Sequence, residues 1–345
     1  MRSATATADR TETSAPGHDT AAAHGSRPSL RQRAWSRRRL RVALGALWLI
    51  DGLLQLQPFM FTKGLALQIL APSGDLQPSV VRVPVGVLVR LVVSHPAAFN
   101  AGFAVAEIAV GLGLICLRAS RASRYVSGGA IALALGIWWL GEGLGGIANG
   151  RAAVAMGAPG AAAIYALVGL VAWPRKSHAD RAGDADRPAR WLPAGWFVLW
   201  TATAAMSVLP AQNSADGLAG QALMGSLMSP DVLRRPEFAL AQHASRLSPT
   251  AAALVAGVLG LLQVAIAVGG FLRGRIRRAA AITGGAFALV CWVLGQGFGG
   301  ISTGQATDVG TGPVLVLLAF ALLARNDQGS RPGAQVISSN FSRTA

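Results

Sequence analysis

Charged residues are scarce in this sequence, and acidic residues are the scarcest of them. Asp, Glu, Lys and Arg make up 13% of the 345 residues, against about 25% in an average soluble domain. The apolar residues Ala, Val, Ile, Leu, Met, Phe, Trp, Tyr and Cys make up 52%. This composition excludes an ordinary soluble enzyme and predicts an integral membrane protein, all-α in fold class.

Residues that bind metals or carry redox chemistry are also few. The two cysteines, Cys116 and Cys291, stand alone in apolar stretches, so the sequence has no CxxC pair, no zinc-site spacing and no disulfide framework. None of the five histidines is central in an apolar stretch, which argues against a haem held by two membrane histidines. Nucleotide-binding and nucleophile motifs are missing too. The residues themselves therefore predict no metal site, no catalytic residue and no cofactor.

Eight stretches of the chain are apolar over roughly the 20 residues that a helix needs to cross a bilayer. They lie near residues 42–60, 97–117, 125–147, 157–173, 192–210, 250–272, 279–301 and 310–324. If the N-terminus is inside, 24 of the 31 Lys and Arg residues lie on the inner side and 7 on the outer side. Because positive residues accumulate on the cytoplasmic side, we expect eight transmembrane helices with both termini in the cytoplasm.

The net charge of +16 does not indicate a nucleic-acid partner, because the basic residues form short clusters between apolar stretches. The expected partner is the lipid bilayer, with the arginines at the end of residues 1–41 orienting the chain and touching anionic lipid. Residues 1–41 and 326–345 contain no long apolar stretch. We expect both to be disordered cytoplasmic tails.

An internal duplication is the most specific pattern in the chain. Residues 138–150, WWLGEGLGGIANG, match residues 292–304, WVLGQGFGGISTG, at 8 of 13 positions without a gap. The halves are therefore expected to be homologous four-helix membrane repeats, residues 42–174 and 191–325, joined by a charged cytoplasmic linker at residues 175–190. Four spans in each repeat make the two repeats parallel, since both begin on the same side of the membrane.

Each half also has a long outer segment after its first span, at residues 61–95 and 211–249. The apolar run PVGVLVRLVV in the first of them predicts interfacial helices over the outer face. In the short outer loops after the third spans, Arg151 and Asp308 occupy nearly aligned positions. We expect them to pair across the repeat axis.

The duplicated segments contain glycines four residues apart, Gly141 with Gly145 and Gly295 with Gly299. Such spacing places two small residues on one helix face, where a second helix can approach closely. Consecutive glycines near the end of a span can instead open the helix, so that backbone groups line a cavity. The sequence favours the packing interpretation and leaves the second open.

Only three acidic residues lie within the predicted spans, and all three are in the first half: Asp51, Glu107 and Glu142. An ionisable group in the bilayer core costs about 2.5–3.5 kcal/mol on insertion scales, so its presence requires a partner or a function. Together with Gln55, one turn from Asp51, these residues form a candidate intramembrane polar site that could bind a ligand or exchange protons.

The aligned residues of the second half are neutral: Thr203, Gln263 and Gln296. They can form hydrogen bonds but cannot change charge near neutral pH. The alternative to a functional site is therefore that the three carboxyl groups are protonated and hydrogen-bond to neighbouring helices, as the neutral groups must do in the second half.

The start of the first repeat, LRVALGALWLIDGL at residues 40–53, contains Gly45 and Gly52 and leads into a long outer segment and three further spans. This unit resembles the DoxX-like family of four-helix bacterial membrane proteins, present here twice in tandem. The resemblance implies a module of the bacterial cytoplasmic membrane that associates with quinone-linked or other redox partners. Quinone enters only through this resemblance, and no family site residue is carried over.

Two functions from different classes follow from these observations. The first, which the sequence favours, is a non-enzymatic accessory or scaffold module that docks a membrane protein partner. The second is a proton-coupled carrier of a small molecule or ion that uses Asp51, Glu107 and Glu142. An enzyme acting on lipid or quinone comes third, because no nucleophile or redox centre is found.

Overall fold

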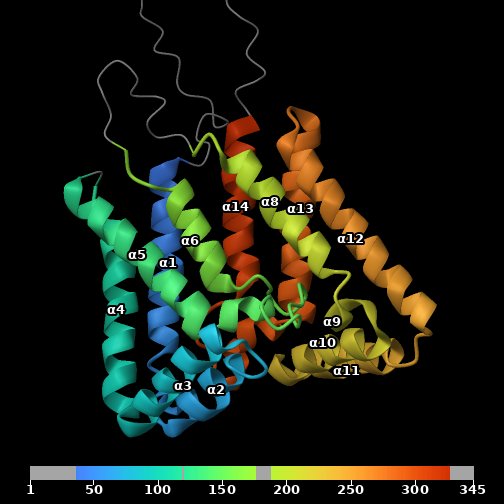
Figure 1. The fold of residues 1–345 in the computed structure, drawn as a ribbon. Helices are drawn as coiled ribbons and strands as arrows, with labels where there is room; N and C mark the ends of the chain where they lie inside the picture. Colours follow the sequence, from blue (N-terminus) through green and yellow to red (C-terminus); the bar gives the residue numbers. More distant parts are fainter. Residues whose placement is uncertain (1–35, 119, 176–187, 327–345) are drawn as a thin grey trace, which may run out of the picture. The chain divides into compact units, whose positions relative to one another are not determined.

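The computed structural model describes residues 36–118, 120–175 and 188–326, and in these ranges the chain forms helices and turns without a β-strand (Figure 1). The predicted all-α fold class is confirmed. Most of the two predicted tails, residues 1–35 and 327–345, and residues 176–187 of the predicted linker lie outside the described residues.

A helix lies at each of the eight apolar stretches. These helices are α1 (Arg37–Leu54), α4 (Pro96–Cys116), α5 (Arg121–Leu140), α6 (Ala161–Val171), α8 (Leu192–Met206), α12 (Pro249–Phe271), α13 (Arg275–Leu294) and α14 (Thr311–Asn326). By length and composition, α4, α12 and α13 with its following turn are long and apolar enough to cross a membrane, whereas α6, α8 and α14 are shorter apolar helices. The three long helices indicate that the protein associates with a membrane.

Helix α1 begins earlier than the sequence predicted. The Ser36 hydroxyl accepts a hydrogen bond from the Arg39 backbone N–H at 3.3 Å and caps the helix, so the basic residues that follow belong to its first turns. The Arg41 guanidinium donates to the carbonyl of Leu117 at 2.9 Å, at the end of α4. The prediction of a disordered tail through residue 41 is therefore wrong for its last five residues.

Arginines cap the last turns of other helices at the same end of the molecule. Arg277 donates to the carbonyls of Gly270 and Phe271, at 3.1 and 3.3 Å, where α12 ends. Arg37 donates to the Trp173 carbonyl just beyond α6 at 3.0 Å. The last carbonyls of a helix have no partner within it, and the negative end of the helix dipole attracts a cation. Arginines in the first turns of α1 and α13 thus bond to carbonyls at the ends of α4, α6 and α12.

The two ends of the helix bundle differ in what they carry (Figure 1). The upper end carries the basic clusters. It contains the start of α1, the ends of α6 and α14, and the α4–α5 and α12–α13 junctions. The predicted outer segments lie across the lower end and are helical. They form η3 (Leu65–Leu70), α2 (Ala71–Ser73), α3 (Ser79–Ser94), α9 (Pro210–Asn213), α10 (Ala215–Met228) and α11 (Asp231–Ala244).

Two glycines allow α1 to lie directly against α4. A Cβ at Gly45 would lie 2.8 Å from the Gly111 carbonyl oxygen, and one at Gly52 would lie 2.7 Å from the Ile108 side chain. Seven residues are close to two helical turns, so both glycines face the same neighbour. This contact brings Asp51 of α1 and Glu107 of α4, each next to one of the touching residues, to the same interface.

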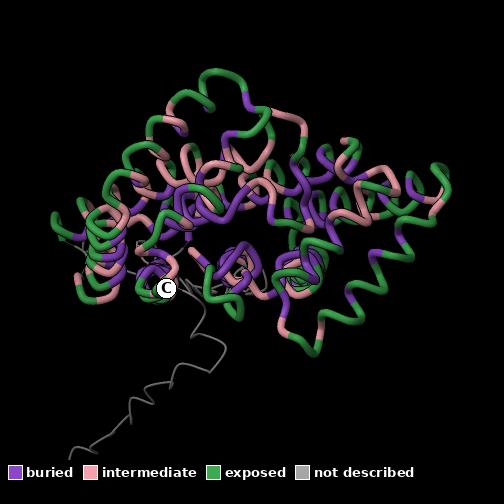
Figure 2. Tube along the Cα trace, turned by 90° about the horizontal axis from the view of Figure 1, so that it is seen from below, coloured by how far each residue is buried: buried purple, intermediate pink, exposed green. Residues whose placement is uncertain are grey.

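The largest hydrophobic cluster of the described residues draws on both halves of the chain. Trp48 and Ile164 from the first half pack in the same cluster as Trp196, Trp200 and Leu318 from the second. Helix α14 contacts both α1 and α6. Figure 2, viewed from below, shows buried segments between the helices and exposed residues along the outlying ones. The halves therefore share their core and do not form separate domains.

Candidate functional site

The glycine-rich segments open the chain at the ends of α5 and α13. Helix α5 ends at Leu140. Leu144 and Gly145, which follow it, have φ of 56° and 63°, values that residues with a side chain rarely adopt. Phe298 and Gly299, after α13, have φ of 58° and 70°. The glycines therefore do not share one continuous helix face, as the opening alternative predicts, and Gly141 lines a cavity. The close backbone approach of the packing prediction is also present, because a Cβ at Gly145, Gly295 or Gly299 would meet the backbone of Pro159, Ala155 or Val309.

In each half, a tryptophan side chain forms a hydrogen bond to the segment that precedes the last helix. The Trp138 indole N–H donates to the Pro159 carbonyl at 2.7 Å, and the Trp292 indole N–H donates to the Val309 carbonyl at 2.6 Å. The acceptors precede α6 and α14, so these bonds hold the starts of the two helices beside the glycine turns.

The side chains of Glu142 and Gln296 each accept a hydrogen bond from a backbone N–H in the first turn of α6 and α14, respectively. Glu142 Oε1 accepts from the Ala162 backbone N–H, and Gln296 Oε1 accepts from the Thr311 backbone N–H, both at 2.9 Å. The first N–H groups of a helix lack partners within it, so either an acid or an amide can supply the oxygen. The hydrogen-bonding interpretation of the carboxyl groups therefore holds for one oxygen of Glu142.

Asp51 joins three parts of the chain. Its Oδ2 accepts from the Tyr165 hydroxyl of α6 at 2.6 Å, and its Oδ1 accepts from the Val309 backbone N–H at 3.1 Å. Tyr165 also packs edge-on against Trp48 with ring centroids 5.3 Å apart. Both carboxylate oxygens are thus used within the protein, by two donors from opposite halves.

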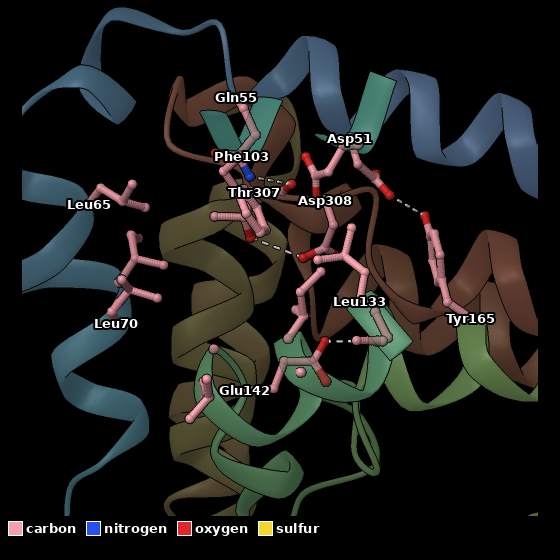
Figure 3. A pocket seen from close by; sticks show the side chains of 18 of the residues that line it. Asp51, Gln55, Leu65, Leu70, Phe103, Leu133, Glu142, Tyr165, Thr307 and Asp308 are labelled. Atoms are coloured by element: carbon pink, nitrogen blue, oxygen red, sulfur yellow. Dashed lines mark hydrogen bonds between the residues drawn. The ribbon is translucent and has the colours of Figure 1, made fainter. Parts of the chain in front are cut away.

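A cavity of about 260 Å³ lies beside these contacts (Figure 3). All four residues of the predicted polar site, Asp51, Gln55, Glu107 and Glu142, line it. The remaining wall is mainly apolar and comes from α1, η3, α3, α4, α5 and α6. Its apolar and aromatic lining residues include Trp48, Leu65, Ile69, Leu70, Leu88, Phe99, Phe103, Leu133, Ile137, Leu140 and Tyr165. The structure therefore brings the predicted residues together.

Three of these residues, Gln55, Glu107 and Glu142, have a buried oxygen that no group in the described part of the chain satisfies. Glu107 is 3% exposed and makes no hydrogen bond within the described part of the chain, and its Oε2 is completely buried. Gln55 is 2% exposed; its amide N–H donates to the Thr307 carbonyl at 3.2 Å, while its Oε1 has no partner. Buried polar atoms are normally paired, and because these residues line the cavity, a molecule inside it can supply the missing donor.

The second half contributes a residue that the sequence analysis did not place in the site. Asp308, in the segment before α14, lines the cavity beside Thr307. Its carboxylate accepts from the Gly310 backbone N–H at 2.7 Å and the Thr307 hydroxyl at 3.0 Å. The expected ion pair with Arg151 is wrong, because Arg151 is exposed and makes no ion pair with it. A search limited to acids inside apolar spans could not find a loop residue.

The aligned neutral residues of the second half form no comparable site. Gln263 donates to the Ser207 hydroxyl at 2.9 Å, and Thr203 donates to a carbonyl of its own helix at the same distance. Gln296 bonds to both the backbone N–H and the hydroxyl of Thr311. The void lined by Thr203 measures about 20 Å³, which is room for a water molecule at most.

The described residues contain no group of three His, Cys, Asp or Glu side chains placed to hold a metal ion. No protein-family model, no curated protein and no solved structure matches the chain. The interpretation of the site therefore depends on its own geometry.

Two substitutions at Glu142 test whether its helix-capping oxygen stabilises the fold. Glu142→Gln keeps the oxygen that accepts from Ala162, as Gln296 does in the other half, so we expect thermal stability close to wild type. Glu142→Leu leaves that N–H unpaired, and we expect a loss of about 1–3 kcal/mol. Thermal unfolding of the detergent-solubilised protein measures both. Equal destabilisation by the two substitutions would contradict the helix-capping role.

Proposed function

We propose that the chain is an integral protein of the bacterial cytoplasmic membrane, with eight membrane helices arranged as two parallel four-helix repeats and both termini in the cytoplasm. The distribution of basic residues supports this topology, because the end that carries their clusters is the one where arginines cap α4, α6 and α12. The corresponding helix pairs α1–α4 and α8–α12, and α5–α6 and α13–α14, pack in both halves, which supports the repeat.

The short helices are compatible with this topology. At about 1.5 Å per residue, the 11 residues of α6 cover roughly 16 Å, about half of the hydrocarbon core. The irregular segment before α6 supplies the rest, and its residues Ala152, Ala153 and Val154 are buried. Irregular backbone is tolerated at membrane depth where protein encloses it.

Labelling at the two ends of α12 tests the topology. In a background with Cys116→Ser and Cys291→Ser, we expect Ser245→Cys to react with a membrane-impermeant maleimide in intact spheroplasts. Arg273→Cys, at the opposite end, should react only after permeabilisation; both positions are exposed. Labelling of Arg273→Cys from outside would contradict the orientation.

For the function, we propose a non-enzymatic membrane module that binds a small, mainly apolar molecule in the cavity of its first half. The observation that carries this proposal is the buried, unpartnered Glu107 carboxylate in the cavity wall. Asp51 holds helices together by accepting from Tyr165 of α6, whereas Glu107 has no such bond and lines the cavity. The resemblance to the DoxX-like family supports an accessory role beside a membrane partner.

Quinone, the ligand that the resemblance implies, fits these residues poorly. Quinone oxygens accept hydrogen bonds, but the unpartnered groups in the wall at Gln55, Glu107 and Glu142 are oxygens. The Tyr165 hydroxyl already donates to Asp51. Among the wall's unpartnered buried atoms, the Trp48 indole N–H is a donor at any pH, whereas the carboxyl groups of Glu107 and Glu142 donate only when they are protonated.

A cavity-filling substitution tests ligand binding. Gly136 of α5 lines the cavity, and a Cβ there would meet nothing within 4 Å. We expect Gly136→Leu to occupy the space and remove the small molecule that mass spectrometry detects with the wild-type protein purified from native membranes. Gly129→Leu is the matched control, since it lies on the same helix, is equally unobstructed and is outside the cavity. A molecule retained by Gly136→Leu, or none bound to wild type, would count against the proposal.

A proton-coupled carrier is the second candidate. The observation that favours it is that Asp51, Glu107 and Glu142 all line the cavity, whereas the residues aligned with them are neutral and the void beside Thr203 measures about 20 Å³. Uptake into proteoliposomes accompanied by proton movement, and abolished by Gly136→Leu, would favour the carrier over the module.

A further inference from the structure

The charge of the cavity wall has one sign. Its acidic residues are Asp51, Glu107, Glu142 and Asp308, and no Lys, Arg or His lines it. The protein satisfies Asp51 and Asp308 with its own donors and Glu142 with one. Glu107 is left as the acid that has no donor from the protein.

The unpartnered atoms of the wall are mostly acceptors. Oxygens of Gln55, Glu107 and Glu142 have no donor, against one donor without an acceptor, the Trp48 indole N–H. Leaving a buried acceptor unpaired costs about 1–3 kcal/mol, and more for a charged group. A molecule that fits this wall therefore brings several N–H or O–H donors, and a positive charge increases its attraction to the carboxylates.

The rest of the wall determines the size and the apolar character of the molecule that fits the cavity. A compact metal ion does not fit, because the described residues include no set of three acidic, His or Cys side chains that could hold one. Phe99, Phe103, Tyr165 and Trp48 add aromatic faces, which attract a cation as well as an apolar group. The volume of about 260 Å³ is slightly below the roughly 300–1,000 Å³ of typical ligand pockets, so the body is small.

We propose that the cavity binds a small organic cation, a primary ammonium group on a short apolar or aromatic body, with the ammonium at Glu107 and Gln55. The inference rests on the proposed function, since it names the ligand class of the same cavity. Glu107 supplies the charge and Gln55 Oε1 a second acceptor. The aromatic and aliphatic residues enclose the body.

Isothermal titration of the full-length protein in lipid nanodiscs tests this with a matched pair of probes, 2-phenylethylamine and the neutral 2-phenylethanol. We expect wild type to bind the amine about tenfold or more tightly than the alcohol, because a charge-assisted hydrogen bond is stronger by about 1–2 kcal/mol. Glu107→Gln, which has the side chain of the aligned Gln263, should abolish the preference for the amine.

Glu237→Gln is the matched control, because Glu237 of α11 is also buried and unpartnered but lies outside the cavity. It should keep the preference for the amine. Equal affinity for both probes in wild type, tighter binding of a short-chain quinone, or a preference that survives Glu107→Gln would overturn the cation proposal while the binding function stands. Probe binding that Gly136→Leu leaves unchanged would instead overturn the proposed function.

Discussion

The Asp51 carboxylate connects the parts of the structure on which the site depends. It accepts one hydrogen bond from Tyr165 in α6 and one from the Val309 backbone of the second half. Isolated charge is expensive in an apolar interior, so a carboxyl group at this depth is retained where donors are fixed around it. Because those donors come from two halves, the bond places the segment containing Thr307 and Asp308 against the first half, where it becomes part of the cavity wall.

The two halves show how one arrangement can be kept with and without a cavity. The glycine turn, the tryptophan bond and the helix-capping oxygen occur in both, with Glu142 in one and Gln296 in the other. In the second half Gln263 donates to Ser207 and Thr203 donates to its own helix, although Gln263 Oε1 also lacks a partner, and the void beside Thr203 is small. In the first half Glu107 is left without a partner beside an open volume. The shared contacts are structural, and the difference between the halves is where binding is expected.

Much of this could be predicted from the sequence, because apolar periods and basic boundaries fix where helices form. All eight predicted stretches contain a helix, and the four predicted polar residues line one cavity. The glycine segments were harder, since spacing alone does not distinguish a packed helix from an opened one. Backbone angles decide between them. Asp308 could not be found either, because it enters the site through a loop contact between residues 51 and 309, far apart in the chain.

An electron cryomicroscopy map of the protein in nanodiscs of native lipid tests most directly whether the cavity holds a ligand. We expect density that belongs to no protein atom in the cavity of the first half, in contact with the Glu107 carboxylate, and no such density in the void beside Thr203. A map in which a protein donor bonds to Glu107 and side chains fill the cavity would contradict the account, because Glu107 would then serve only to hold the helices together.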